Sequence, residues 1–193
     1  CVDDDPVTGL SGGSGGGGVS DPANVIISDD FSYADGSLVP NGGWATFSGT
    51  AGDLLVAGGQ ARIKHGAPSE DASLAFTAPS GDVYYGVVFT VEDLGAPYSG
   101  SDNEYFINFI DDNFAFRARV DIVPPTGGGD FSVGLSSIGS TADATWATDF
   151  TYGTTYRLIV RYNQDDNIAE LWIDATADTD TSILGDDESD PGT

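Results

Sequence analysis

Short apolar segments separated by turn residues recur in this chain and limit the folds that it can adopt. Val, Ile, Tyr and Phe dominate these segments, and several alternate apolar with polar side chains, as half-buried β-strands do. No segment has the spacing of a long amphipathic helix. The predicted strands are residues 25–31, 44–47, 53–57, 60–65, 72–77, 83–92, 105–110, 114–123, 131–135, 146–150, 156–162 and 168–174. Such a series predicts an all-β fold, an antiparallel β-sandwich or a barrel.

Two predicted hairpins assign side chains to faces. Turn residues at 111–113 and 163–167 separate long strand candidates and indicate tight reversals of the chain. Because alternate residues of a strand point to opposite faces, one face of each hairpin is expected to enter the core. The predicted core residues are Phe114, Phe116, Ala118, Val120, Ile122, Tyr156, Leu158, Val160, Tyr162, Ala169, Leu171 and Ile173.

The charge of the chain excludes two classes of partner. There are 31 acidic residues against 6 basic ones, a formal net charge of −25. Nucleic-acid binding needs a basic surface, and so does adhesion of a bare polypeptide to an anionic membrane. No apolar run approaches the roughly 18 residues of a membrane-spanning helix. Most of the acid is Asp, which is favoured in turns and is also an oxygen ligand for calcium.

The N-terminal residues carry a further signal. Cys1 is the only cysteine, and a Gly/Ser run at 11–18 follows it after several acidic residues. This arrangement resembles the start of a mature bacterial lipoprotein. The resemblance implies a lipid on Cys1, a flexible acidic and Gly-rich tether over residues 1–22, and a position at the extracellular face of the outer membrane. The alternative is a chain boundary that happens to fall at a cysteine.

Three stretches carry fold markers: Asp29-Asp30-Phe31 followed by Gly43-Trp44, Gly59 with Ile63, and residues 153–158 running into 170–174. Together they resemble the concanavalin A-like, laminin G-like jelly rolls of bacterial surface proteins. The resemblance implies a jelly-roll β-sandwich over residues 23–175, followed by an acidic C-terminal segment over 176–193. Such domains usually end with a further strand. None is evident in that segment, so a jelly roll that lacks its last strand is an open alternative.

Residues suited to catalysis are sparse in this sequence. His65 is the single histidine, which leaves no second one for a triad or a His-based metal cluster. The Glu-x-Asp-x-Glu run of related jelly-roll glucanases does not occur. The sequence therefore predicts a protein that is not an enzyme. Two distant carboxylates that converge for glycoside hydrolysis are the alternative.

Calcium is a candidate cofactor with a structural role. Laminin G-like jelly rolls hold calcium with Asp side chains and loop carbonyl groups, and the resemblance places Asp29 and Asp30 at the usual first-strand position. Asp35, in the loop that follows, would add a further oxygen ligand. The alternative for each residue is hydrogen bonding within a turn.

All six basic residues lie in predicted strands, as pairs two or four residues apart. A four-residue loop over 163–166 would set Arg157 across from Trp172 and Arg161 diagonal to Glu170. Arg suits carboxylate or sulfate groups, and Trp suits stacking on a sugar. The predicted site for an anionic glycan or an acidic protein segment consists of Trp172, Arg157, Arg161, Arg117 and Arg119. Cross-strand pairing of these cations with acidic residues is the alternative.

Two functions from different classes follow from these patterns. The first is a non-catalytic cell-surface module for recognition and attachment, most simply glycan binding, whose partner is a polysaccharide or a surface protein. The second is a structural subunit of an extracellular fibre, coat or outer-membrane complex, a homo-oligomer or larger assembly joined through strand edges. The Arg/Trp pattern favours the first function, and the missing last strand favours the second.

Overall fold

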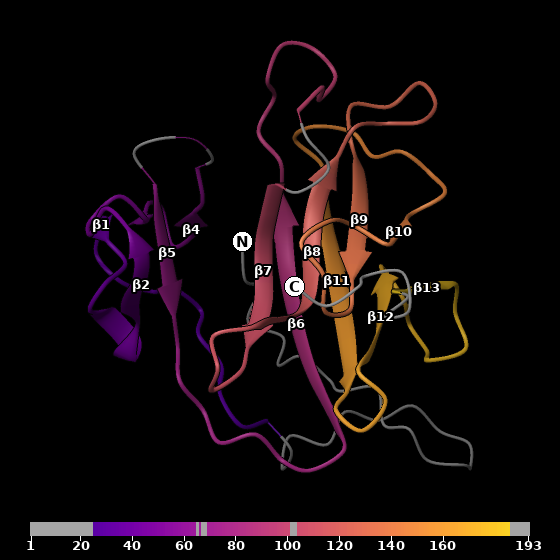
Figure 1. The fold of residues 1–193 in the computed structure, drawn as a ribbon. Coiled ribbons are helices and arrows are strands. Elements are labelled where there is room, and N and C mark those ends of the chain that lie inside the picture. Colours follow the sequence, from indigo (N-terminus) through magenta and orange to yellow (C-terminus); the bar gives the residue numbers. More distant parts are fainter. Residues whose placement is uncertain (1–24, 65, 67–68, 101–103, 186–193) are drawn as a thin grey trace. The chain divides into compact units, whose positions relative to one another are not determined.

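The computed structural model describes residues 25–64, 66, 69–100 and 104–185 (Figure 1). This part of the chain is all-β, with antiparallel sheets and no α-helix, consistent with a β-sandwich. None of its helical turns is long and apolar enough to cross a membrane. The described residues divide into two compact units, 25–78 and 79–185. The predicted domain over 23–175 takes residues from both units. Cys1 and the predicted tether over 1–22 lie outside the described residues.

The unit of residues 25–78 contains five short strands and a small core. Leu38, Leu54 and Val56 are buried, and Phe31 and Trp44 are among the half-buried side chains that pack on them. One sheet has the order β1-β3-β4, and β2 pairs with β5 in another. The elements are β1 (Gly36–Ser37), the 3-10 turn η2 (Asn41–Gly43), β2 (Ala45–Gly49), β3 (Leu55–Val56), β4 (Ala61–Arg62) and β5 (Glu70–Ser73).

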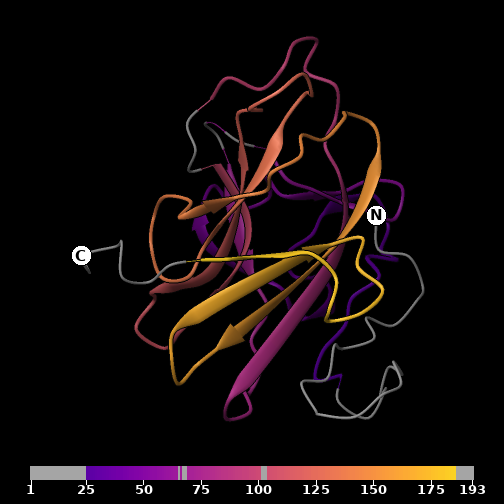
Figure 2. The same ribbon diagram turned by 90° about the vertical axis from the view of Figure 1, so that its right-hand side faces the viewer.

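The unit of residues 79–185 contains two four-stranded antiparallel sheets, with the orders β10-β9-β8-β7 and β13-β12-β11-β6. Figure 2 shows β6, β11 and β12 side by side in one layer. The strands are β6 (Asp82–Thr90), β7 (Glu104–Ile110), β8 (Phe116–Val123), β9 (Ser132–Ser136), β10 (Ala144–Thr145), β11 (Thr155–Asn163), β12 (Ile168–Ile173) and β13 (Ser182–Leu184).

One hydrophobic core joins these two sheets. Val120 and Leu135 come from one sheet, and Leu158, Val160 and Leu171 from the other, all with 0% exposure. The predicted core faces of 156–162 and 168–174 are therefore confirmed at these positions. Alternation identified them because a strand between two layers buries every second side chain.

The pairing of β11 with β12 differs from the predicted register by two residues. The turn occupies 164–167, so Ile159 lies opposite Trp172, and Arg161 lies opposite Glu170. The predicted partner of Trp172 was Arg157. Because a shift of two residues preserves the alternation, the face assignment survives the change of register.

Two predicted strands are wrong. Residues 25–31 form no strand, and in 146–150 only Phe150 makes a β-bridge, to Phe131. Both segments have β-forming residues, but a strand exists only where a partner supplies backbone hydrogen bonds. For residues 25–31 no described segment supplies that partner.

The prediction for Phe114 is also wrong. This residue was expected in the core, but its side chain is 72% exposed. Its φ of 64° and its N–H bond to the carbonyl of Asp111 place it in the hairpin turn before β8. The left-handed backbone of the turn interrupts the period-two alternation, so counting back from Phe116 assigned the wrong direction.

The acidic C-terminal segment contributes a strand that the sequence did not indicate. In β13, Ile183 pairs with Leu171 of β12, and the Ser182 hydroxyl donates to the Glu170 carboxylate at 2.7 Å. A strand of three residues between acidic turns is too short to show a pattern. Its pairing depends on contacts with β12, which the residues of the short segment itself do not indicate.

Candidate functional site

The predicted Arg/Trp site is not brought together by the fold. Arg117 and Arg119 lie on β8, whereas Arg157 and Arg161 lie on β11. These strands belong to different sheets of the sandwich. Only the β11 pair shares a sheet with Trp172. One continuous cationic stripe is therefore absent from the described residues.

Each of these arginines already has a partner in its own surroundings, but only Arg161 pairs with an acidic residue across two strands, as the alternative predicted. The Arg161 guanidinium lies 2.7 Å from Glu170 and 4.0 Å from Asp82. The Arg157 guanidinium donates to the carbonyl of Ala175. Arg117 pairs with Asp111 at 2.9 Å, and Arg119 pairs with Asp121 at 3.0 Å. An incoming anion would have to displace these groups.

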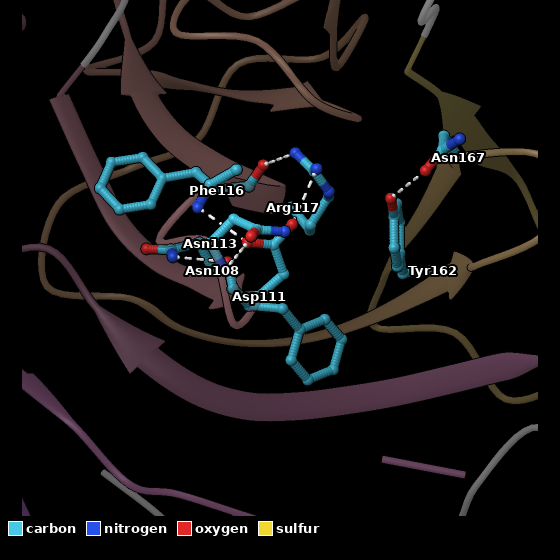
Figure 3. A network of polar contacts seen from close by, with 9 residues as sticks. Asn108, Asp111, Asn113, Phe116, Arg117, Tyr162 and Asn167 are labelled. Atoms are coloured by element: carbon cyan, nitrogen blue, oxygen red, sulfur yellow. Dashed lines mark hydrogen bonds and ion pairs between the residues drawn. The ribbon is translucent and has the colours of Figure 1, made fainter. Parts of the chain in front are cut away.

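Asp111 organises the first hairpin turn (Figure 3). Its Oδ1 accepts the N–H groups of Asn113 and Ala115 at 2.8 and 3.0 Å, and its Oδ2 accepts from the Arg117 guanidinium. Burial raises the pKa of Asp111, but these hydrogen bonds and the Arg117 charge outweigh it and lower that pKa. In the second hairpin, the Tyr162 hydroxyl donates to Asn167 at 2.8 Å. The contacts of Asp111 stabilise the turn between β7 and β8, and the contact of Tyr162 with Asn167 stabilises the turn between β11 and β12.

Trp172 lies on the predicted face but is only 3% exposed. A sugar cannot stack on a ring that is covered in this way. The indole Nε1 of Trp172 has no hydrogen-bond partner, and the same is true of Nε of Arg161, two of only four such buried atoms in the described part of the chain. Sequence alternation placed Trp172 correctly but could not show its burial.

The predicted calcium ligands Asp29, Asp30 and Asp35 accept hydrogen bonds from groups of the protein itself. Asp29 accepts hydrogen bonds from the Phe31 N–H at 2.7 Å, the Tyr33 hydroxyl at 2.8 Å and the Trp44 indole at 2.6 Å. Asp30 accepts from the Ser32 N–H, and Asp35 from the Gly58 N–H. Both Asp29 oxygens face protein donors, so this arrangement does not fit a calcium site. The described residues contain no group of three or more His, Cys, Asp or Glu side chains that could hold a metal.

The outer edge of β6 differs from the other sheet edges of the sandwich. Proteins limit unwanted pairing at edges with short strands, bulges, Pro or Lys. β10 and β13 have two and three residues, and the pairing of β7 with β8 contains two register shifts. β6 has nine residues in unbroken register with β11. It contains no Pro or Lys, and its single charged residue is Asp82 at its start.

The hydrogen bonds of β11 show which backbone groups of β6 face outward. The Arg157 carbonyl accepts from Asp174, and the Arg157 N–H donates to the Asp174 side chain, so the backbone of Arg157 points toward β12. By alternation, the even-numbered residues of β11 bond to their odd-numbered partners in β6. The N–H and C=O groups of Tyr84 and Gly86 therefore point to the outer edge, where no described strand pairs with β6.

The strand was predicted from the sequence, but its position at the edge of the sheet was not. Residues 83–92 were predicted as a strand because they are rich in Val, Tyr and Phe, yet strand order depends on contacts across the whole unit. The length of this run and the absence of basic residues from it were the available signals. No family model, no curated protein and no solved structure matches this chain. The functional proposal therefore depends on the contacts of its own residues.

Proposed function

We propose that this protein is a non-catalytic structural subunit of the bacterial cell surface, anchored by a lipid on Cys1, which assembles through the outer edge of β6. The supporting observation is a nine-residue edge strand without the protective features of β7, β10 and β13. The N–H and C=O groups of Tyr84 and Gly86 point to this edge, where an added strand can bond them. The resemblance to jelly rolls of surface proteins fits this role.

The charge of the chain shapes this assembly. With a net charge of −25, two copies repel one another at low ionic strength. Salt shortens the range of this repulsion to about 8 Å at 0.15 M. Backbone pairing at β6 involves no ion pair, so added salt should strengthen self-association. Assembly through ion pairs would weaken under the same change.

A proline at the β6 edge tests the proposed function. Tyr84→Pro removes an outward N–H and leaves the bonds from β6 to β11 in place, because an edge strand tolerates Pro at such a position. Sedimentation equilibrium at 0.15 M salt should show concentration-dependent association of the wild type and at least about tenfold weaker association of the variant.

Tyr84→Phe is the matched control, because it removes the hydroxyl but keeps the backbone N–H. It should associate like the wild type. A wild-type chain that is monomeric at all concentrations and salt levels would contradict the proposed function. So would a folded Tyr84→Pro chain that associates as strongly as the wild type.

Recognition of a glycan is a second candidate function, supported by the two buried nitrogen donors without partners on Trp172 and Arg161. Both atoms are buried, so a polar ligand could accept hydrogen bonds from them only after the groups that cover them are displaced. On an array of neutral and acidic glycans, Trp172→Phe should lower retention at least about tenfold, because it keeps an aromatic ring and loses the N–H. Trp146→Phe is the control. A blank array for the wild type, with calcium present, would remove this candidate.

A further inference from the structure

Three aromatic side chains gather at the surface of the 25–78 unit. The rings of Phe31 and Trp44 are stacked, with centroids 6.1 Å apart and an angle of 29° between their planes. The Tyr33 hydroxyl and the Trp44 indole N–H donate to the same Asp29 oxygen, at 2.8 and 2.6 Å. The cluster packs on the small core of the unit, yet all three side chains are only half-buried. Phe31, Tyr33 and Trp44 are called the aromatic platform below.

The backbone holds the aromatic platform in place at a conformational cost. Phe31 has a φ of 53°, a left-handed value that bulky residues rarely adopt. Its N–H donates to Asp29 at 2.7 Å, and its carbonyl accepts from the Tyr33 N–H at 2.7 Å. Gly42 lies against the same groups, and a Cβ at this position would overlap the Tyr33 hydroxyl. Strained residues cluster at ligand sites, where fixed side chains lower the entropy lost on binding.

Two carboxylates beside the aromatic platform keep capacity to accept hydrogen bonds. Asp29 is half-buried and accepts three, whereas the two oxygens of a carboxylate offer roughly four acceptor sites. Asp30 is exposed and accepts from the Ser32 N–H at 3.0 Å. Hydrogen bonds from the side chain and the backbone of Ser32 lower the pKa of Asp30, so its carboxylate is charged at neutral pH. Both groups can therefore accept from a hydroxyl group of a ligand.

These features select a class of ligand. Aromatic rings pack on the apolar C–H face of a sugar ring, and carboxylates accept hydrogen bonds from its hydroxyl groups. The net charge of −25 disfavours a glycan that carries carboxylate or sulfate groups of its own. We propose that the aromatic platform, together with Asp29 and Asp30, binds a neutral hexose unit of a glycan. The site uses neither β6 nor Trp172, so it is independent of the proposed assembly.

A ¹⁹F NMR titration of the full chain, labelled with 5-fluorotryptophan, tests the inference. The probes are neutral oligosaccharides of glucose, mannose, galactose and N-acetylglucosamine. At least one of them should shift the Trp44 signal in a saturable manner and leave the signals of Trp146 and Trp172 in place. Trp44→Phe assigns the reporter signal, because the spectrum of that variant lacks it.

Two variants remove different parts of the site. Phe31→Asn removes one ring and introduces a residue that tolerates a left-handed backbone, so the affinity for the probe should fall at least about tenfold. Asp30→Asn keeps an acceptor for the Ser32 N–H but removes the charge, and should lower the affinity about fivefold. Because Asp30 is exposed, this variant tests the site even if Phe31→Asn does not fold. Phe114→Ala removes a 72% exposed ring of the other unit and, as the matched control, should bind like the wild type.

The outcomes separate this inference from the functions proposed above. If no probe shifts the Trp44 signal, or if Asp30→Asn and a folded Phe31→Asn chain bind like the wild type, the inference is wrong. If a probe shifts the Trp172 signal instead, glycan recognition stands and its placement at the aromatic platform is wrong. A uronate oligosaccharide that binds as tightly as its neutral counterpart would contradict the assigned ligand class. A chain that does not self-associate leaves this inference in place, because the site does not involve β6.

Discussion

Replacement of Asp121 by alanine is expected to lower the free energy of unfolding of the 79–185 unit by about 3–5 kcal/mol. Asp121 has 0% exposure, and its partner Arg119 has 4%. The guanidinium also donates to the Ser140 carbonyl and lies 5.2 Å from the centre of the Tyr105 ring. Without Asp121 the buried Arg119 charge loses its counter-ion, and its desolvation is no longer compensated. Urea denaturation followed by circular dichroism measures the loss.

The Arg117–Asp111 pair provides the control for this prediction. Its side chains are 25% and 30% exposed, so solvent screens their attraction. Arg117→Ala should therefore cost less than about 1 kcal/mol. The double variant Arg119→Met/Asp121→Leu should recover much of the stability lost in Asp121→Ala, because it leaves no unpaired charge. Equal losses for Asp121→Ala and Arg117→Ala would show that burial of the Arg119 pair has no energetic consequence.

Replacement of Glu70 by alanine is expected to destabilise the 25–78 unit by about 3 kcal/mol. Glu70 is 6% exposed. Its Oε2 accepts the N–H groups of Gly52 and Leu54 at 2.9 and 3.0 Å, and its Oε1 accepts from the Thr46 hydroxyl. The variant leaves the buried Leu54 N–H without an acceptor. Trp44 is the only tryptophan of residues 25–78, so its ¹⁹F NMR signal in the chain labelled with 5-fluorotryptophan, followed during urea denaturation, reports the change apart from Trp146 and Trp172.

The same carboxylate should make this unit sensitive to acid. Burial raises the pKa of Glu70, but the hydrogen bonds from Thr46, Leu54 and Gly52 outweigh it and lower that pKa below its usual 4.5. The unfolded chain therefore binds the proton more readily than the folded unit. The stabilisation is complete above the unfolded pKa and is lost as pH falls through the lower folded value.

Glu70→Gln isolates this effect from the many other carboxylates of the chain. It keeps the size of the side chain but does not titrate. The wild type should lose more stability between pH 7 and pH 3 than Glu70→Gln does, as measured by the same ¹⁹F signal of Trp44 during urea denaturation. An identical pH dependence for the two chains would contradict the assigned role of Glu70.

The Arg119–Asp121 pair shows where sequence reasoning reached its limit. Alternation along 114–123 correctly separated these residues from the core face of Ala118 and Val120. The sequence also predicted that Arg119 belongs to a site for a ligand, whereas both charged side chains are buried. The direction of a side chain depends on its own strand, but its exposure depends on what packs over that strand. Glu70 is buried for a similar reason, since its acceptors satisfy donors 16 to 24 residues away in sequence.

Period-two alternation and turn chemistry are local properties, so the all-β class, the two hairpins and the core faces of β11 and β12 could be predicted from the residues alone. The division into two units, the order of the strands and the edge position of β6 depend on the folded chain. The same holds for the absence of a strand at residues 25–31 and the presence of one at 182–184. The physical reason is that a strand is completed by backbone hydrogen bonds to a partner, and that partner is chosen by contacts between residues far apart in the chain.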